Sequence, residues 1–109
     1  MVAYDWNGDD LIISCRSTAA KFINAQRHPH VVFSVPDGVD NLTVTGEATC
    51  LSTGPDRDHQ TERLRDRLRQ GAPWAADILD ADIAQGLDAV GRAVVVIEPD
   101  SVELLRPLG

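Results

Sequence analysis

The feature that most constrains the fold is a series of short segments with strand-like patterning. They are residues 2–6, 11–14, 31–35, 42–48 and 93–97. Apolar and polar side chains alternate throughout 42–48, as in a half-buried strand, whereas 93–97 is the unbroken apolar run of a buried strand. Asn7-Gly8 supplies the turn of a hairpin between the first two segments. The pattern predicts a mainly β fold, a small antiparallel barrel of about five or six strands.

Three further segments have helical patterning. A short amphipathic helix follows the first hairpin, with Ser17 or Thr18 as its candidate N-cap and Pro29 at its end. Residues 55–70 are rich in Arg, Asp, Glu and Leu and predict a helix at the surface. A second helical stretch after it is expected to reach Gly91.

Pro99-Asp100 follows the last apolar run and is expected to turn the chain into a final strand at 102–105. The helices are thus α insertions in a β fold, one early and two late. We find no internal repeat.

Length and composition limit the class of protein. The chain of 109 residues is long enough for one domain, taken as 1–109. A net charge of -7 argues against a nucleic-acid partner, because such partners demand a surplus of Lys and Arg. The longest aliphatic run is far shorter than the roughly 20 residues of a membrane-spanning helix. Cys15 and Cys50 lack the spacing of a disulfide scaffold or zinc site and indicate reduced thiols in a cytoplasm.

One segment gathers groups that bind anions. It reads Ser14-Cys15-Arg16-Ser17-Thr18-Ala19-Ala20-Lys21, and Lys21 is the only lysine of the chain. First-turn N–H groups of a helix have no internal partner and carry the positive end of the helix dipole, so phosphate or carboxylate oxygens bind there. Arg16 can add bidentate contacts and Lys21 a point charge. On these residues alone an alternative stays open, in which Ser17 caps the helix and both cations are solvated surface charges.

A larger set of residues resembles the pyridoxamine 5'-phosphate oxidase-like split barrels. In order, the set is Trp6, Asn7-Gly8-Asp9, Leu11-Ile12-Ile13-Ser14, Ala20-Lys21, Asn24, Arg27, Pro29, Val31 to Val35, Gly46-Glu47-Ala48 and Glu98-Pro99. The order and spacing of these motifs carry the resemblance over nearly the whole chain. It implies an antiparallel split β-barrel of the FMN-binding type.

The resemblance also implies a cofactor site. In this family the strand that ends in Ser14-Cys15-Arg16 and the helix that carries Lys21 hold the cofactor phosphate. Transferred residue by residue, the site comprises Ser14, Cys15, Arg16, Ser17, Ala20 through its backbone, and Lys21. Asn41 is similar to a polar residue that family members place near the ring system, although an ordinary turn-initiating Asn is an equal alternative. No catalytic side chain and no metal ligand is implied.

The implied function is that of an oxidoreductase dependent on coenzyme F420, a deazaflavin, or on FMN, which transfers a hydride between the cofactor and a small organic substrate. F420 is favoured, because the chain looks like the short actinobacterial branch of the family and is rich in Arg and poor in Lys. The family implies a cytoplasmic homodimer with the cofactor at the subunit interface. One alternative is a split barrel that binds flavin, deazaflavin, haem or a tetrapyrrole without turnover. Another is a small acidic dimer with no ligand.

The chain departs from the family pattern at its start. It begins within what should be the second strand, so the usual leading helix and first strand are missing from this sequence. Either the chain is truncated or another subunit covers the exposed edge. That strand commonly contributes to the ring and substrate pocket, so its absence bears on activity more than on the fold.

Three other sets of residues stand out. They are His28 and His30; Asp77, Asp80 and Asp82; and Tyr4 and Trp6. The dipole at the C-terminus of the first helix explains the histidine pair better than a metal site does. The acidic set indicates a solvated helical face rather than a cation site. The two rings are expected to pack in the barrel core or a dimer interface rather than on a planar cofactor.

Overall fold

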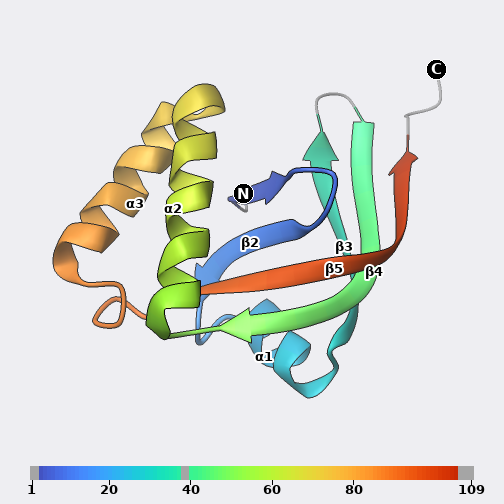
Figure 1. The fold of residues 1–109 in the computed structure, drawn as a ribbon, viewed down its shortest axis with the longest axis horizontal. Helices are drawn as coiled ribbons and strands as arrows, with labels where there is room; N and C mark the ends of the chain where they lie inside the picture. The colour runs from blue at the N-terminus through green and yellow to red at the C-terminus, as the bar shows by residue number, and fades with distance from the viewer. Residues whose placement is uncertain (1–2, 38–39, 106–109) are drawn as a thin grey trace.

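The computed structural model describes residues 3–37 and 40–105. In this part of the chain the elements are, in order, β1 (Tyr4–Trp6), β2 (Leu11–Arg16), α1 (Ala20–Arg27), β3 (His30–Asp37), β4 (Asp40–Leu51), α2 (Gly54–Gly71), α3 (Pro73–Gln85) and β5 (Arg92–Leu105). These strands form one antiparallel sheet in the order β1-β2-β5-β4-β3 (Figure 1). None of the described helices is long and apolar enough to cross a membrane. The prediction of a mainly β fold with an antiparallel sheet and α insertions is confirmed.

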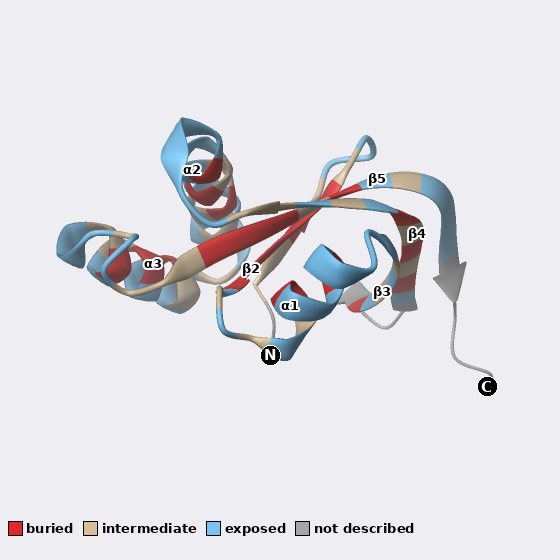
Figure 2. Cartoon of the chain, turned by 90° about the horizontal axis from the view of Figure 1, so that it is seen from below, coloured by how far each residue is buried: buried red, intermediate tan, exposed pale blue. Residues whose placement is uncertain are grey.

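Helices cover both faces of the sheet. Successive side chains of a strand point to opposite faces, so the apolar run of β2 contributes to two cores. On one face Ile13 packs with Phe22 of α1. On the other face Ile12 packs with Leu64 of α2 and Leu79 of α3. Figure 2 shows α1 and α2 on opposite sides of the strands, which explains why β2 is buried along almost its whole length.

The central strand, β5, continues as one strand through the position at which a turn was predicted, although it bends toward its C-terminal end (Figure 1). It pairs with β2 from Arg92 to Ile97 and with β4 from Val94 to Leu105. Beyond Ile97, β5 has a described neighbour, β4, on one side only. A proline has no N–H group to donate, so it is tolerated where one side of a strand is unpaired. The prediction that Pro99-Asp100 turns the chain is therefore wrong.

The helical segments are confirmed, but one end was misplaced. α2 covers the charged segment predicted at 55–70, and α1 ends before Pro29 as expected. α3 ends at Gln85 rather than near Gly91. Gly86 follows it with a φ of +96°, in the left-handed region that glycine adopts readily and that ends a helix.

Gly46 allows β4 to approach β5 closely. Between Thr45 and Gly46 the register shifts, and Asp100 of β5 is left without a partner in β4. A Cβ atom on Gly46 would lie 2.0 Å from the carbonyl oxygen of Glu98, which is far inside van der Waals contact. A side chain at this position would therefore force the two central strands apart.

We expect Gly46→Ala to lower the free energy of unfolding by about 1 to 3 kcal/mol or more, because the added methyl group meets backbone rather than a flexible side chain. Urea unfolding measures this loss. Gly71→Ala is the matched control, since a Cβ there meets nothing within 4 Å. Equal stability of the two variants would contradict the packing argument.

Candidate functional site

The end of β2 carries the first residues of the predicted cofactor site, and they point to opposite faces of the sheet. Ser14 is 6% exposed and lies toward α2 and α3, where its Oγ accepts a hydrogen bond from Nη1 of Arg92 at 3.0 Å. Cys15 lies on the opposite side, in the core that contains Phe22. The sheet therefore separates side chains that the sequence placed in one site.

Arg16 is held by the α3–β5 loop, residues 86–91. Its Nη1 donates to the carbonyl oxygen of Val90, and its Nη2 lies 3.6 Å from Oδ2 of Asp82. The buried Asp82 also accepts a hydrogen bond from Nε of Arg92 at 3.1 Å. Two guanidinium groups thus share one carboxylate of α3.

A tight turn between β2 and α1 replaces the predicted N-cap. The Ala19 N–H donates to the Arg16 carbonyl at 2.9 Å, and the Ser17 N–H donates to the Gly91 carbonyl at 2.9 Å. Ala19 takes the N-cap position and makes no side-chain cap. The prediction that Ser17 or Thr18 caps the helix is therefore wrong, because both residues lie in the turn that precedes it.

The first turn of α1 keeps the free donors that an anion site needs. The N–H groups of Phe22 and Ile23 both donate to the Ala19 carbonyl at 3.1 Å. The N–H groups of Ala20 and Lys21 have no hydrogen-bond acceptor in the described part of the chain. This turn contains no acidic residue, so nothing within it offsets the positive end of the helix dipole.

Lys21 lies in α1, the helix whose Phe22 packs in the same core as Cys15. Burial raises the pKa of Cys15, whereas the positive charges of Lys21 and Arg92 lower it. Burial also raises the pKa of Cys50, whose Sγ lies 3.9 Å from the Phe22 carbonyl oxygen. Both cysteines are free thiols. The Lys21 charge is therefore felt at the face of the sheet that α1 covers.

Asn41 lies at the opposite end of β4 from α1. Its register partners are Pro36 of β3 and Leu105 of β5, and its side chain is exposed. α1 packs near the other end of β4, as Figure 1 shows and as the contact between Cys50 and α1 requires. A single chain therefore does not bring Asn41 to Lys21.

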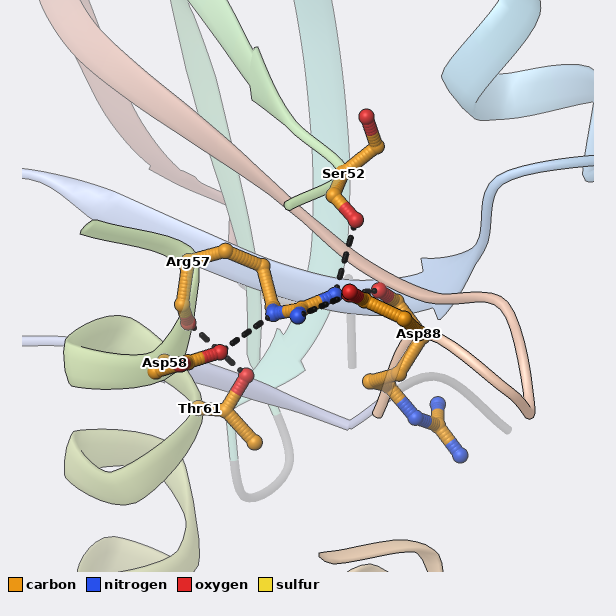
Figure 3. Close-up of polar contacts among 6 residues, drawn as sticks. Ser52, Arg57, Asp58, Thr61 and Asp88 are labelled. Carbon is orange, nitrogen blue, oxygen red and sulfur yellow. Dashed lines mark hydrogen bonds and ion pairs between the residues drawn. The ribbon is translucent and has the colours of Figure 1, made fainter. Parts of the chain in front are cut away.

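A buried arginine of α2 fixes the α3–β5 loop. Arg57 is 3% exposed, and its Nη1 donates to the carbonyl oxygens of Ser52 at 2.7 Å and Arg92 at 2.8 Å. Its Nε and Nη2 donate to the carboxylates of Asp58 and Asp88 (Figure 3). Burial lowers the pKa of Arg57, but the hydrogen bonds to the two carboxylates outweigh it and the pKa lies above its usual value. These contacts join the end of β4, the start of β5 and the loop.

Sequence reasoning missed Arg57, Asp82 and Arg92. Arg57 precedes the buried Thr61 by one helical turn, and this spacing was the available signal that it belongs to the buried stripe of α2. Asp82 was assigned to a solvated face, which is wrong, because it is buried and paired with Arg92. No local pattern links Arg92 with Ser14, since the two are 78 residues apart.

The other residues that stood out in the sequence form ion pairs or pack within the fold. The remaining two aspartates of the acidic set pair with Arg69 of α2. His30 Nε2 lies 3.1 Å from Oδ2 of Asp100, and both side chains are exposed. Tyr4 and Trp6 pack against the barrel core, as expected. No group of three or more potential metal ligands occurs within 3–37 and 40–105.

Comparison with known proteins identifies the fold. No protein-family model and no curated protein matches the sequence. A candidate pyridoxamine 5'-phosphate oxidase from Listeria innocua is similar in structure, with a TM-score of 0.58 and 17% identity over 95% of this chain and 74% of that chain. An F420 reductase has a TM-score of 0.55 and 20% identity, over 92% of this chain and 73% of its own.

A pyridoxamine 5'-phosphate oxidase-related, FMN-binding protein from Nostoc punctiforme has a TM-score of 0.53 and 15% identity, over 96% of this chain and 64% of its own. The chain therefore has the fold of the pyridoxamine 5'-phosphate oxidase-like split barrels. The predicted fold type is confirmed.

The position of Lys21 predicts a change in thiol chemistry. In a Cys50→Ser background, we expect Lys21→Ala to move the pH midpoint of Cys15 alkylation by iodoacetamide upward, because the charge that stabilises the thiolate is lost. Arg27→Ala, an exposed cation at the other end of α1, should leave the midpoint unchanged. An unchanged midpoint in the Lys21 variant would place its ammonium away from Cys15.

The Arg57 contacts predict a large loss of stability on substitution. Arg57→Met keeps the apolar stem but leaves the carbonyl groups of Ser52 and Arg92 without their charged donor, so we expect the free energy of unfolding to fall by about 2 to 3 kcal/mol. Arg27→Met, at an exposed position, should change it by less than about 0.5 kcal/mol. Guanidinium unfolding measures both, and similar values for the two variants would refute the role of Arg57.

Proposed function

We propose that the chain binds a phosphorylated flavin-like cofactor, with its phosphate at the N-terminus of α1. The observation that carries the proposal is the pair of N–H groups on Ala20 and Lys21 that no described residue accepts. The Lys21 side chain brings a positive charge to the same turn, which holds no acidic residue. The fold shared with an F420 reductase and an FMN-binding protein supports this class of ligand.

A phosphate group suits this turn on electrostatic grounds. Phosphate oxygens accept hydrogen bonds from first-turn N–H groups and interact favourably with the helix dipole. The chain carries a net charge of -7, so an anion is repelled over most of its surface. Several arginines form ion pairs with carboxylates, whereas no ion pair among the described residues involves Lys21. Its charge is therefore available to a ligand.

Arg16 contributes less directly to the proposed site, and Ser14 lies outside it. The Arg16 guanidinium is bonded to the Val90 carbonyl and lies near Asp82, so contact with the phosphate requires those interactions to break. Ser14 faces the other side of the sheet and accepts a hydrogen bond from Arg92. The proposed phosphate site thus rests on Ala20 and Lys21 rather than on the whole segment.

The proposed activity is hydride transfer between the cofactor and a small organic substrate. When bound, the cofactor supplies the hydride chemistry, and the chain binds and orients it. We favour F420 over FMN, because the sequence looks like the short actinobacterial branch and is rich in Arg and poor in Lys.

We further propose that the active form is a homodimer. In one chain Asn41 lies away from α1, so contact between Asn41 and the cofactor held at Lys21 requires a second copy. β3 is an edge strand of the described sheet, and its Val32 is 63% exposed. An open edge with exposed apolar side chains favours pairing with another chain. Light scattering after gel filtration measures the mass directly.

Fluorescence titration with F420 and with FMN tests the cofactor site. We expect saturable binding of one of them, weakened in Lys21→Ala by about 1 to 3 kcal/mol, or roughly 5- to 150-fold, because a charge-assisted contact is lost. Arg16→Ala should have a smaller effect, since its guanidinium is already bonded within the chain. Arg27→Ala keeps the total charge of the Lys21 variant and should bind as the wild type does.

Three outcomes are informative. Binding followed by reduction of a substrate by the reduced cofactor supports an oxidoreductase. Binding without turnover of any substrate supports a carrier instead. Failure of both cofactors to bind, or equal loss in the Lys21 and Arg27 variants, overturns the phosphate site.

A further inference from the structure

A pocket of about 320 Å³ lies between the β1–β2 hairpin and the α2–α3 pair. Ser14 and Arg92 line it, so it opens on the face of the sheet opposite to Cys15 and α1. Its volume is at the lower end of the roughly 300–1,000 Å³ of sites that bind small molecules. The pocket is therefore distinct from the proposed phosphate site and has the size for a small organic ligand.

The walls of the pocket are apolar. Leu68 of α2 and Leu79 of α3 line it together with Trp74 and Ile78. Trp74 and Ile78 are four residues apart and so share one face of α3, yet they are 55% and 53% exposed. When a ligand covers large apolar side chains at the rim of a pocket, their removal from water favours binding.

One side of the pocket is polar and offers unused donors. Arg92 donates from Nε and Nη2 to Asp82 and from Nη1 to Ser14. A guanidinium carries five N–H groups, so two of them have no acceptor among the described residues. The Ser14 hydroxyl accepts the bond from Arg92, and its own proton remains available to a further acceptor.

The polar side of the pocket contains a cation. Arg92 is the only charged residue among the described residues that line the pocket. Asp82 neutralises it only in part, because the same carboxylate lies 3.6 Å from Nη2 of Arg16. Two guanidinium groups against one carboxylate leave an excess of positive charge, which favours an anionic group on the ligand.

We propose that this pocket binds a small organic acid with a ring-bearing apolar body and one carboxylate. The carboxylate accepts hydrogen bonds from Arg92 and Ser14, and the ring lies among Trp74, Ile78 and Leu79. An aromatic body suits the Trp74 ring, since aromatic pairs interact beyond the area that they bury. The site is independent of the cofactor proposal, because no lining residue belongs to α1.

Isothermal titration calorimetry with 1-naphthylacetate tests the proposal, and 1-naphthylacetamide is the neutral ligand of the same shape. We expect saturable binding of the acid and affinity for the amide lower by about tenfold or more, because only the acid gains the charge-assisted contact. Binding of the acid should also weaken as salt is added. Equal affinity for acid and amide would remove Arg92 as the recognition group.

Two pairs of variants on α3 place the ligand. Ile78→Glu sets a negative charge at the rim and should abolish acid binding, whereas Ala81→Glu adds the same charge at an exposed position outside the pocket and should not. Ala75→Trp fills the pocket, and Ala84→Trp adds the same ring at an exposed position outside it. Thermal unfolding of all four variants separates a blocked site from an unfolded helix. If a folded Ala75→Trp protein binds the acid as the wild type does, the ligand lies elsewhere.

A competition experiment with the cofactor distinguishes the acid-binding pocket from the proposed phosphate site. We expect 1-naphthylacetate to bind with unchanged affinity when F420 or FMN is saturating, since the two sites lie on opposite faces of β2. Loss of acid binding under these conditions would make the pocket part of the cofactor site and overturn its assignment as a separate one. Acid binding in a protein that binds neither cofactor would support the pocket and count only against the phosphate site.

Discussion

The pairing of β5 with β2 on one side and β4 on the other is the interaction on which the rest of the structure depends. β5 is the last of the described strands in sequence, yet its Val94 and Val95 are fully buried and belong to the two cores on opposite faces of the sheet. These contacts form only after the segment 54–91 has returned the chain to the sheet, and such long-range pairing carries a loop-closure cost. Arg57 of α2 fixes the start of β5 by donating a hydrogen bond to the carbonyl group of Arg92.

A consequence of this arrangement is that β2 presents two different chemical surfaces. On the α1 side lie Cys15 and the first turn of α1, where the N–H groups of Ala20 and Lys21 have no acceptor among the described residues. On the α2–α3 side, Ser14 and Arg92 form the polar side of an apolar pocket. One residue of chain separates the two environments, because neighbouring residues of a strand face opposite ways. The proposed phosphate site and the apolar pocket therefore lie on opposite faces of one strand.

The charges of the molecule are organised around its arginines. The chain has an excess of acidic residues, and Arg57, Arg63 and Arg92 are partly or fully buried in pairs with carboxylates. Hydrogen bonds to these carboxylates raise the pKa of Arg63 as they do that of Arg57, despite the opposing effect of burial. Arginine suits such sites because its planar group donates several hydrogen bonds at once. Lys21 is different, since no described ion pair involves it.

The sequence by itself determined that the chain forms strands and three helices and that Lys21 lies near the start of the first helix, because alternation, helical spacing and the Gly and Pro positions are local signals. Local signals failed at Pro99, where the open side of β5 tolerates a proline, and at Ser17, which lies in a turn that bonds to Gly91. The tertiary structure alone decided the partners of Arg57 and Arg92 and the division of the predicted site between two faces. Those features depend on strand order and register, which bring together residues as distant as Ser14 and Arg92. Strand order and register result from contacts summed over the whole chain, so no single segment encodes them.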